Sequence, residues 1–559
     1  MLFALSDALD AAGRASEAEQ LLADAAEERE GDAEIVARLV HLYVNRGRLE
    51  PAARMLVEAS ARRPNTTSEL LPLWNNLTSP GRKDALHVDD LRQLRVEPAA
   101  EAARLYFLSR VARAWSRDSV AQSALEQSVA ARPIFAPALR DMLDSIWGED
   151  AFDEQQKRRH SEPLVTAARD AGNEALALEL QGAALLAQKK AVEASRVLAE
   201  AARVAASSPA ELLLTQAGAE LAQNHAQQFE QLAWRLISDR PRFEPTYPAL
   251  FRHYMERGNA AAARNLLTTW LRNVPDGVEP RLIEATIQAR VAGQRDQAER
   301  SMLALFAEHP DRPDVLANMR ALYAEWNQLP KLIDLLEQQR AAQPYNHPLV
   351  AQLVDLYASQ KRNEEASRVL DAARTALADD PDRLYFVAHL YQRIDQQQQS
   401  EEVLQHALRA NPSFAPAGND LGYTWADAGK NLDRAESMIR RAVEAEPDNP
   451  MFLDSLGWVL YKQGRFDEAR RHLEQAASNE RGADPVILDH LGDALYRLNL
   501  SDDAVRRWRD SLARIAAVPE GAREQHNALR LQLDQKLRQA EQRQPVSVAP
   551  IAGESRAQR

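Results

Sequence analysis

Residues 421–425, 456–460 and 491–495 read Leu-Gly-Tyr-Thr-Trp, Leu-Gly-Trp-Val-Leu and Leu-Gly-Asp-Ala-Leu, so a Leu-Gly pair recurs at steps of 35 residues. An alanine follows each glycine by 12 or 13 residues, and a large apolar residue follows that alanine by four. These positions are Ala435 and Ile439, Ala469 and Leu473, and Ala504 and Trp508. Small residues let two helices cross closely, and a large neighbour fills the space beside the crossing. Each unit is therefore predicted to be a pair of antiparallel helices.

The same period extends toward the N-terminus. Tyr323, Tyr357 and Tyr391 are spaced by 34 residues, and Gly13 and Gly47 are also 34 residues apart. Prolines recur where second helices are expected to end, and a proline there turns the chain into the next pair. These prolines are Pro64, Pro133, Pro241, Pro275, Pro310, Pro344, Pro412 and Pro447. Carried through the chain, the period predicts an all-α, right-handed superhelical solenoid of about fifteen antiparallel helix hairpins.

The composition restricts the classes of function. The chain has 559 residues, no cysteine and a formal net charge of -13. Without cysteine it has no disulfide, thiolate nucleophile or thiolate metal site. The acidic excess repels phosphate backbones, so the composition disfavours a general nucleic-acid binder. No stretch approaches 18 consecutive apolar residues, and we expect no direct insertion into a membrane.

The sequence contains no motif typical of catalysis or metal binding. A glycine-rich phosphate loop, an H-E-x-x-H helix, a nucleophile elbow and an EF-hand loop are all absent. The twelve histidines occur singly. Paired carboxylates such as Glu401-Glu402 fall at the starts of second helices, where they favour the positive end of the helix dipole. We therefore predict a protein that is not an enzyme and has no catalytic residue, metal site or cofactor.

The repeat unit resembles that of the tetratricopeptide repeat family, in its bacterial multi-repeat form, with Leu-Gly in the first helix, alanine and a large apolar residue in the second, and a closing proline. Residues 412–517 fit this pattern best. We divide the chain into N-terminal repeat hairpins over 1–64, divergent hairpins over 65–241, a regular array over 242–517, a C-terminal capping helix over 518–543 and a disordered tail over 544–559.

In this family, first-helix side chains that face away from the second helix line a concave surface that contacts partner proteins. The family's phase places eleven side chains of the last three hairpins on that surface or at its edge. They are Asn419, Tyr423, Asp427, Asp454, Trp458, Tyr461, Lys462, Asp489, Asp493, Tyr496 and Arg497. Acidic and aromatic side chains together suit a partner segment with basic and apolar residues. The alternative for Tyr461 and Tyr496 is ordinary packing within the repeat.

The resemblance implies a non-enzymatic scaffold that binds partner proteins on its concave surface. One alternative is an RNA-binding helical-repeat protein, which the acidic surface disfavours. Another is the recognition arm of a larger enzyme or cell-envelope assembly, because Met1 falls within a predicted first helix and no capping unit precedes it. We expect a cytoplasmic protein if Met1 is the true start, and a periplasmic or envelope-associated one if an upstream segment is missing. The sequence leaves the oligomeric state open.

Overall fold

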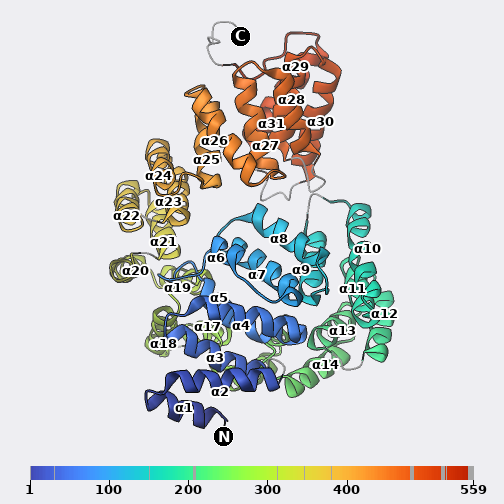
Figure 1. The fold of residues 1–559 in the computed structure, drawn as a ribbon, viewed down its shortest axis with the longest axis vertical. Coiled ribbons are helices and arrows are strands. Elements are labelled where there is room, and N and C mark those ends of the chain that lie inside the picture. The colour runs from blue at the N-terminus through green and yellow to red at the C-terminus, as the bar shows by residue number, and fades with distance from the viewer. Residues whose placement is uncertain are drawn as a thin grey trace. The chain divides into compact units, whose positions relative to one another are not determined.

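The computed structural model describes residues 2–551 apart from 30–31, 150–151, 206–208, 292, 311, 345, 379, 479–483, 518–522 and 524–525. Within these residues the chain forms 31 α-helices, two short 3-10 turns and no β-strand. Consecutive helices pack in pairs (Figure 1). This confirms the predicted all-α repeat of helix hairpins. The chain forms two compact units, Met1–Gly148 with Glu154–Gln352, and Glu149–Asp153 with Leu353–Arg559.

The first unit contains the helices up to α20. They are α1 (Leu2–Ala11), α2 (Ala15–Glu28), α3 (Ala33–Asn45), α4 (Leu49–Arg62), α5 (Thr67–Thr78), α6 (Val88–Gln93), α7 (Glu101–Ala114), α8 (Asp118–Ala130), α9 (Ala136–Gly148), α10 (Glu154–Asp170), α11 (Glu174–Ala187), α12 (Ala191–Val204), α13 (Ala210–Ala222), α14 (Ala226–Asp239), α15 (Thr246–Glu256), α16 (Ala260–Asn273), α17 (Val278–Ala289), α18 (Arg295–Glu308), α19 (Pro313–Glu325) and α20 (Leu329–Ala342). α21 (His347–Ser359) runs across the unit boundary.

The second unit contains the remaining helices. They are α22 (Asn363–Ala376), α23 (Pro381–Arg393), α24 (Gln397–Ala410), α25 (Ala415–Asp427), α26 (Leu432–Ala445), α27 (Pro450–Lys462), α28 (Phe466–Ala477), α29 (Pro485–Arg497), α30 (Ser501–Ala517) and α31 (Asn527–Glu541). The unit boundary lies inside the predicted regular array over 242–517. Our subdivision of the repeats at 64, 241 and 517 was made on residue identity, and it stays a prediction.

Within a pair, the turn from the first helix to the second passes through a residue with positive φ. Gly464 has a φ of 79° between α27 and α28, and Asn499 has a φ of 62° between α29 and α30. The left-handed region is open to glycine, and asparagine is one of the few other residues that visit it readily. These residues therefore end the first helix and allow a tight hairpin turn.

The recurring glycines lie where the two helices of a pair cross. A Cβ atom on Gly457 of α27 would lie 2.5 Å from Leu473 Cγ and 3.2 Å from the carbonyl oxygen of Ala469, both on α28. A Cβ atom on Gly492 of α29 would lie 2.4 Å from Trp508 Nε1 on α30. Because no side chain fits at either position, the predicted role of these glycines in close helix crossing is confirmed.

Successive hairpins are linked by a hydrogen bond from an aromatic side chain to an acidic one. The hydroxyl of Tyr391 on α23 donates to Asp371 Oδ1 on α22 over 2.7 Å. The indole Nε1 of Trp425 on α25 donates in the same way to Glu401 Oε2 on α24 over 3.1 Å. At these positions the periodic aromatic side chain therefore both fills the core and joins a first helix to the preceding second helix.

Two segments differ from the regular pattern. α6 has six residues and packs against α7, so the chain between α5 and α7 departs from the regular hairpin pattern. Within the range 518–543, which was expected to form a capping helix, the structure describes α31, which packs against α30 and buries Leu533 and Leu537. Its role as a cap stays a prediction. The tail over 544–559 was predicted to be disordered, but the structure describes residues 544–551 and places them against α27 and α29. Residues 552–559 lie outside the described part of the chain.

Candidate functional site

The eleven residues predicted as the binding surface lie on three first helices of the second unit, α25, α27 and α29. α25 carries Asn419, Tyr423 and Asp427; α27 carries Asp454, Trp458, Tyr461 and Lys462; and α29 carries Asp489, Asp493, Tyr496 and Arg497. α25 packs against α27, and α27 packs against α29. We call these eleven residues the first-helix surface. Seven of the eleven are buried, so the chain itself covers much of this surface.

An aromatic stack occupies the middle of the first-helix surface. The ring of Trp458 stacks on His490 with a centroid distance of 3.8 Å and on Tyr461 with a centroid distance of 5.0 Å. Trp458 Nε1 donates to Asp427 Oδ1 over 3.1 Å, and Lys462 Nζ lies 4.8 Å from the centroid of the Trp458 ring. Trp458 is 4% exposed, so it acts here mainly as the packing centre of the surface.

His490, a member of this stack, forms a buried ion pair with Asp454. Their closest atoms, Asp454 Oδ1 and His490 Nδ1, are 2.9 Å apart. Burial by itself lowers the pKa of His490, but the carboxylates of Asp454, Asp489 and Asp493 outweigh burial and raise this pKa above its ordinary value. Asp454 therefore faces a histidine of its own chain.

Lys536 of α31 reaches into the acidic part of the surface. Its Nζ atom donates to Asp489 Oδ1 over 2.7 Å and to Asp493 Oδ1 over 2.5 Å. Burial is the largest influence on the pKa of Asp489 and raises it, and the neighbouring Asp493 raises it further. The two carboxylates in turn raise the pKa of Lys536 against the opposing effect of burial. The lysine that these acids were predicted to attract is thus supplied by the chain itself.

The C-terminal segment, residues 544–551, lies on the first-helix surface without regular secondary structure. The main-chain N–H of Val546 donates to the hydroxyl oxygen of Tyr496 over 2.8 Å. The main-chain N–H of Ala549 donates to Asp493 Oδ2 over 2.9 Å. The carbonyl oxygen of Ala549 accepts from Arg497 Nη2 over 3.1 Å and from the hydroxyl of Tyr461. The surface therefore holds a peptide by its main chain.

The remaining predicted residues lie toward α25. Tyr423 is half-buried. Burial is the largest cause that raises its pKa, and the negative charge of Asp454 raises this pKa further. Lys462 Nζ donates to the carbonyl oxygen of Asp427 over 3.2 Å, and burial lowers the pKa of Lys462 although Asp427 opposes that shift. The side chain of Asp427 is 60% exposed. Asn419 is buried, with its Nδ2 donating to Asp420 Oδ1 over 3.2 Å.

A pocket of about 460 Å³ opens where the C-terminal segment ends. Its lining residues are Leu432, Asp433, Glu436, Lys462, Gln463, Arg465 and Ile551. Arg465 Nη1 donates to Glu436 Oε2 over 2.9 Å, so two charges of the lining are paired with each other. Among these residues only Lys462 was predicted from the sequence. The others lie on a second helix, in a turn or in the C-terminal segment, and the spacing of first-helix residues gives no information about these positions.

The sequence analysis also missed the role of residues beyond the last hairpin. Lys536 lies beside Leu533 and Leu537 on the buried side of α31. A lysine in an apolar stripe is a signal of a buried ionic partner, because a lone buried ammonium group is costly. The main-chain contacts of Val546 and Ala549 have no such signal, since every residue carries the same main-chain groups.

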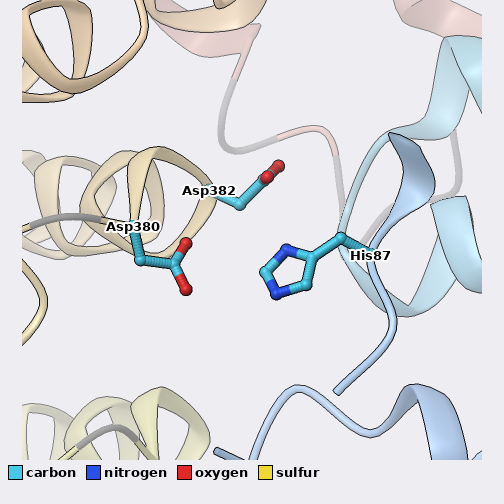
Figure 2. A group of neighbouring side chains, drawn as sticks. All are labelled: His87, Asp380 and Asp382. Atoms are coloured by element: carbon cyan, nitrogen blue, oxygen red, sulfur yellow. The ribbon is translucent and has the colours of Figure 1, made fainter. Parts of the chain in front are cut away.

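Figure 2 shows three neighbouring side chains that each lie at the start of a helix. They are His87, Asp380 and Asp382. The main-chain N–H of His87, which precedes α6, donates to Asp90 Oδ2 over 2.8 Å. Asp380 precedes α23 and accepts from the main-chain N–H of Arg383 over 3.1 Å, and Asp382 lies in the first turn of that helix. Because His87 belongs to the first unit and the two aspartates to the second, we assign no metal site to them.

Among the described residues, no helix combines the length and the apolar character that a membrane crossing requires.

Comparisons with known proteins place repeats at both ends of the chain. Residues 11–73 match one model of the tetratricopeptide repeat, and residues 420–486 and 455–522 match a second. No curated protein matches the chain. The second set of matches contains the whole of α27, α28, α29 and α30.

Several solved structures are similar to this chain at low identity. MamA AMB-1 is 20% identical, with 30% of this chain and 99% of that chain covered and a TM-score of 0.25. PilF of Pseudomonas aeruginosa is 18% identical, with 37% of this chain and 86% of PilF covered and a TM-score of 0.27. The APC/C hetero-tetramer Cut9-Hcn1 contains a chain that is 13% identical, with 92% of this chain and 93% of that chain covered and a TM-score of 0.29. The matches to the family models, together with the consecutive helix pairs, show that the chain contains tetratricopeptide repeats.

Proposed function

We propose that this protein is a non-enzymatic scaffold whose first-helix surface binds a segment of a partner protein through the partner's main chain. Tetratricopeptide repeats are in general protein-interaction scaffolds. The observation that supports this site is the C-terminal segment, because the surface already holds a stretch of polypeptide there. A partner segment of the same kind would meet the same donors and acceptors.

Four side chains supply the recognition. Tyr496 and Asp493 accept from main-chain N–H groups, and Tyr461 and Arg497 donate to a main-chain carbonyl oxygen. Since every peptide carries these main-chain groups, the four side chains set the position and direction of a bound segment. Its side chains then contribute through packing against the surface.

The donors are held in place before a partner arrives. Arg497 Nε donates to the hydroxyl oxygen of Tyr461 over 3.3 Å, and its guanidinium carbon lies 5.9 Å from the centroid of the Phe466 ring. Tyr461 is fully buried and stacks on Trp458. A preorganised surface loses little conformational entropy on binding, which favours affinity for a flexible segment.

The charges of the surface favour a largely uncharged segment. His490 is paired with Asp454, and Lys536 with Asp489 and Asp493, so three predicted acceptors for a basic partner residue are already in use. We therefore propose that a basic residue of the partner is at most a secondary contact, at the exposed Asp427. The acidic groups also oppose a phosphate backbone, so RNA is not the proposed ligand.

The test is a selection of random peptides displayed on phage against the full chain. Because the C-terminal segment uses Arg497 as well, affinities are compared in a chain that carries Val546→Asp and Ala549→Pro to detach the segment. Enriched peptides are expected to bind this chain at least about tenfold more tightly than the same chain with Arg497→Ala added, which corresponds to about 1.4 kcal/mol. Tyr461→Phe, which removes one donor and keeps the ring, is expected to reduce the affinity of these peptides less than Arg497→Ala does. Arg374→Ala on α22 is the matched control, because Arg374 pairs with Glu402 away from the surface. Peptides that bind the detached chain equally well with and without Arg497→Ala would place partner binding elsewhere on the array.

A further inference from the structure

The C-terminal segment and a partner peptide need the same atoms of the first-helix surface. Ala549 alone uses three of the four recognition groups, Asp493, Arg497 and Tyr461, and Val546 uses the fourth, Tyr496. A second peptide cannot hydrogen-bond to these groups while the segment is in place. We propose that the C-terminal segment is a built-in competitor, so that a partner peptide binds the surface by displacing it. This inference rests on the proposed function.

The segment is attached in a way that suits exchange. α31 ends at Glu541, and the chain turns at once, with the main-chain N–H of Gln544 donating to the carbonyl oxygen of Gln539 over 2.9 Å. Gln539 Oε1 also accepts from the main-chain N–H of Ser547 over 2.8 Å. α31 is itself anchored by Lys536, so the segment stays beside the surface even when it is released.

The segment is held weakly compared with the helices. Of its side chains, only Val546 is buried, at 8% exposure, and residues 548–551 are half-buried. Its main chain adds a few hydrogen bonds to the surface. A short tether gives an effective concentration of about 1 mM. If the free segment binds with a Kd of about 0.1 mM, tethering lowers the apparent affinity of a competing peptide by about tenfold. A competitor of this strength keeps weak ligands off and yields to stronger ones.

The segment also indicates the chemistry of the ligand. Residues 544–551 read Gln-Pro-Val-Ser-Val-Ala-Pro-Ile and carry no charged side chain, although 27% of the whole chain is charged. An uncharged segment fits a surface whose buried acids are already paired. We infer that the displacing ligand is an uncharged, extended peptide with small apolar residues flanked by proline. Ile551 lines the pocket beside Asp433 and Glu436, so a longer ligand has room to continue there.

The experiment uses the full chain and a labelled synthetic peptide with the sequence of residues 544–551. The release variant carries Val546→Asp and Ala549→Pro, which place a charge at a buried position and remove the N–H that donates to Asp493. The peptide is expected to bind the release variant about tenfold more tightly than the wild type. Adding Arg497→Ala to the release variant is expected to abolish this gain. Gln544→Glu is the matched control, because it adds the same charge at an exposed side chain of the segment, and this variant is expected to bind the peptide as the wild type does.

Hydrogen exchange supplies a second readout in the unmodified chain. Saturating peptide is expected to increase amide exchange at residues 546 and 549, whose N–H groups bond to Tyr496 and Asp493. If the peptide binds the wild type and the release variant equally well and amide exchange at residues 546 and 549 does not change, the proposal that the segment competes with a partner peptide is wrong. If Arg497-dependent peptides from phage selection then bind both forms equally, the proposed function stands and only the competition fails. If no peptide binds either form, both proposals fail.

Discussion

Lys536 Nζ on α31 lies 2.5 Å from Asp493 Oδ1 on α29, and the same ammonium group lies 2.7 Å from Asp489 Oδ1. One cation thus balances two buried carboxylates and joins the capping helix to the last hairpin. Burial makes each of these charges dependent on the others, because an unpaired ion in this environment is strongly unfavourable. The capping helix therefore stabilises the surface that the C-terminal segment occupies.

Replacing Lys536 by Met is expected to destabilise the last hairpin by about 3–5 kcal/mol, because Asp489 and Asp493 lose their buried cation. The measurement is hydrogen exchange of α29 and α30 with urea titration. Lys331→Met is the control, since Lys331 pairs with Glu299 at 51% side-chain exposure, and a change of about 0–1 kcal/mol is expected there. Unchanged protection of α29 in Lys536→Met would show that the carboxylates do not depend on this lysine.

Replacing Gly457 by Ala is expected to destabilise α27 and α28 by about 1–3 kcal/mol, because the added Cβ would lie 2.5 Å from Leu473 Cγ. Gly218→Ala on α13 is the matched control. A Cβ at residue 218 meets nothing within 4 Å, so that change should stabilise its helix by about 0.5–1 kcal/mol. Local exchange rates measure both effects, since repeat arrays couple mainly to neighbours. If both substitutions changed stability in the same direction, the assigned helix crossing at Gly457 would be wrong.

Stability of the last hairpins is expected to fall as pH rises above 6.5, the ordinary pKa of histidine. Burial opposes protonation of His490, but the carboxylates of Asp454, Asp489 and Asp493 together outweigh burial and raise the pKa of His490 in the folded chain. The folded state then holds this proton more tightly than the unfolded state. Its stabilising contribution is complete below pH 6.5 and is lost as pH rises through the folded pKa. The pKa of Asp489 is also raised in the folded chain, to about 6. Protonation of Asp489 therefore favours the folded state as well, and this contribution is lost as pH rises through about 6.

The measurement is the protection of α27 and α29 amides between about pH 6 and pH 9, corrected for intrinsic exchange. His490→Gln removes the titrating group and is expected to flatten the decline. His41→Gln on α3 is the control, because His41 is exposed in the other unit, and it should keep the wild-type slope. An equal slope in His490→Gln would assign the pH dependence to other groups.

Single-stranded RNA is expected to show no salt-sensitive binding at micromolar protein concentration, because the net charge of -13 and the acids of the first-helix surface repel phosphates. Filter binding at low and high salt measures this directly. Retention that falls steeply with added salt would restore the RNA-binding alternative.

The periodic part of the structure could be predicted from the sequence. Gly457 and Gly492 identified the crossings correctly, because a crossing is decided by residues of two neighbouring helices within one repeat. The same spacing occurs at Gly182, Ala194 and Leu198, where a Cβ on Gly182 would lie 2.5 Å from Leu198. This crossing could therefore have been predicted from the same spacing.

What the sequence by itself determined was the helix pairs, their crossings and the helices on which the eleven surface residues lie. Only the tertiary structure decided what those residues touch. Lys536 reaches Asp489 and Asp493 from more than forty positions away, and Ala549 reaches Tyr461 from 88 positions away. Local periodicity reports the packing of neighbours, because each residue of a repeat meets its equivalents at a fixed spacing. A contact with a non-repeated segment has no period, so it depends on which part of the folded chain reaches the surface.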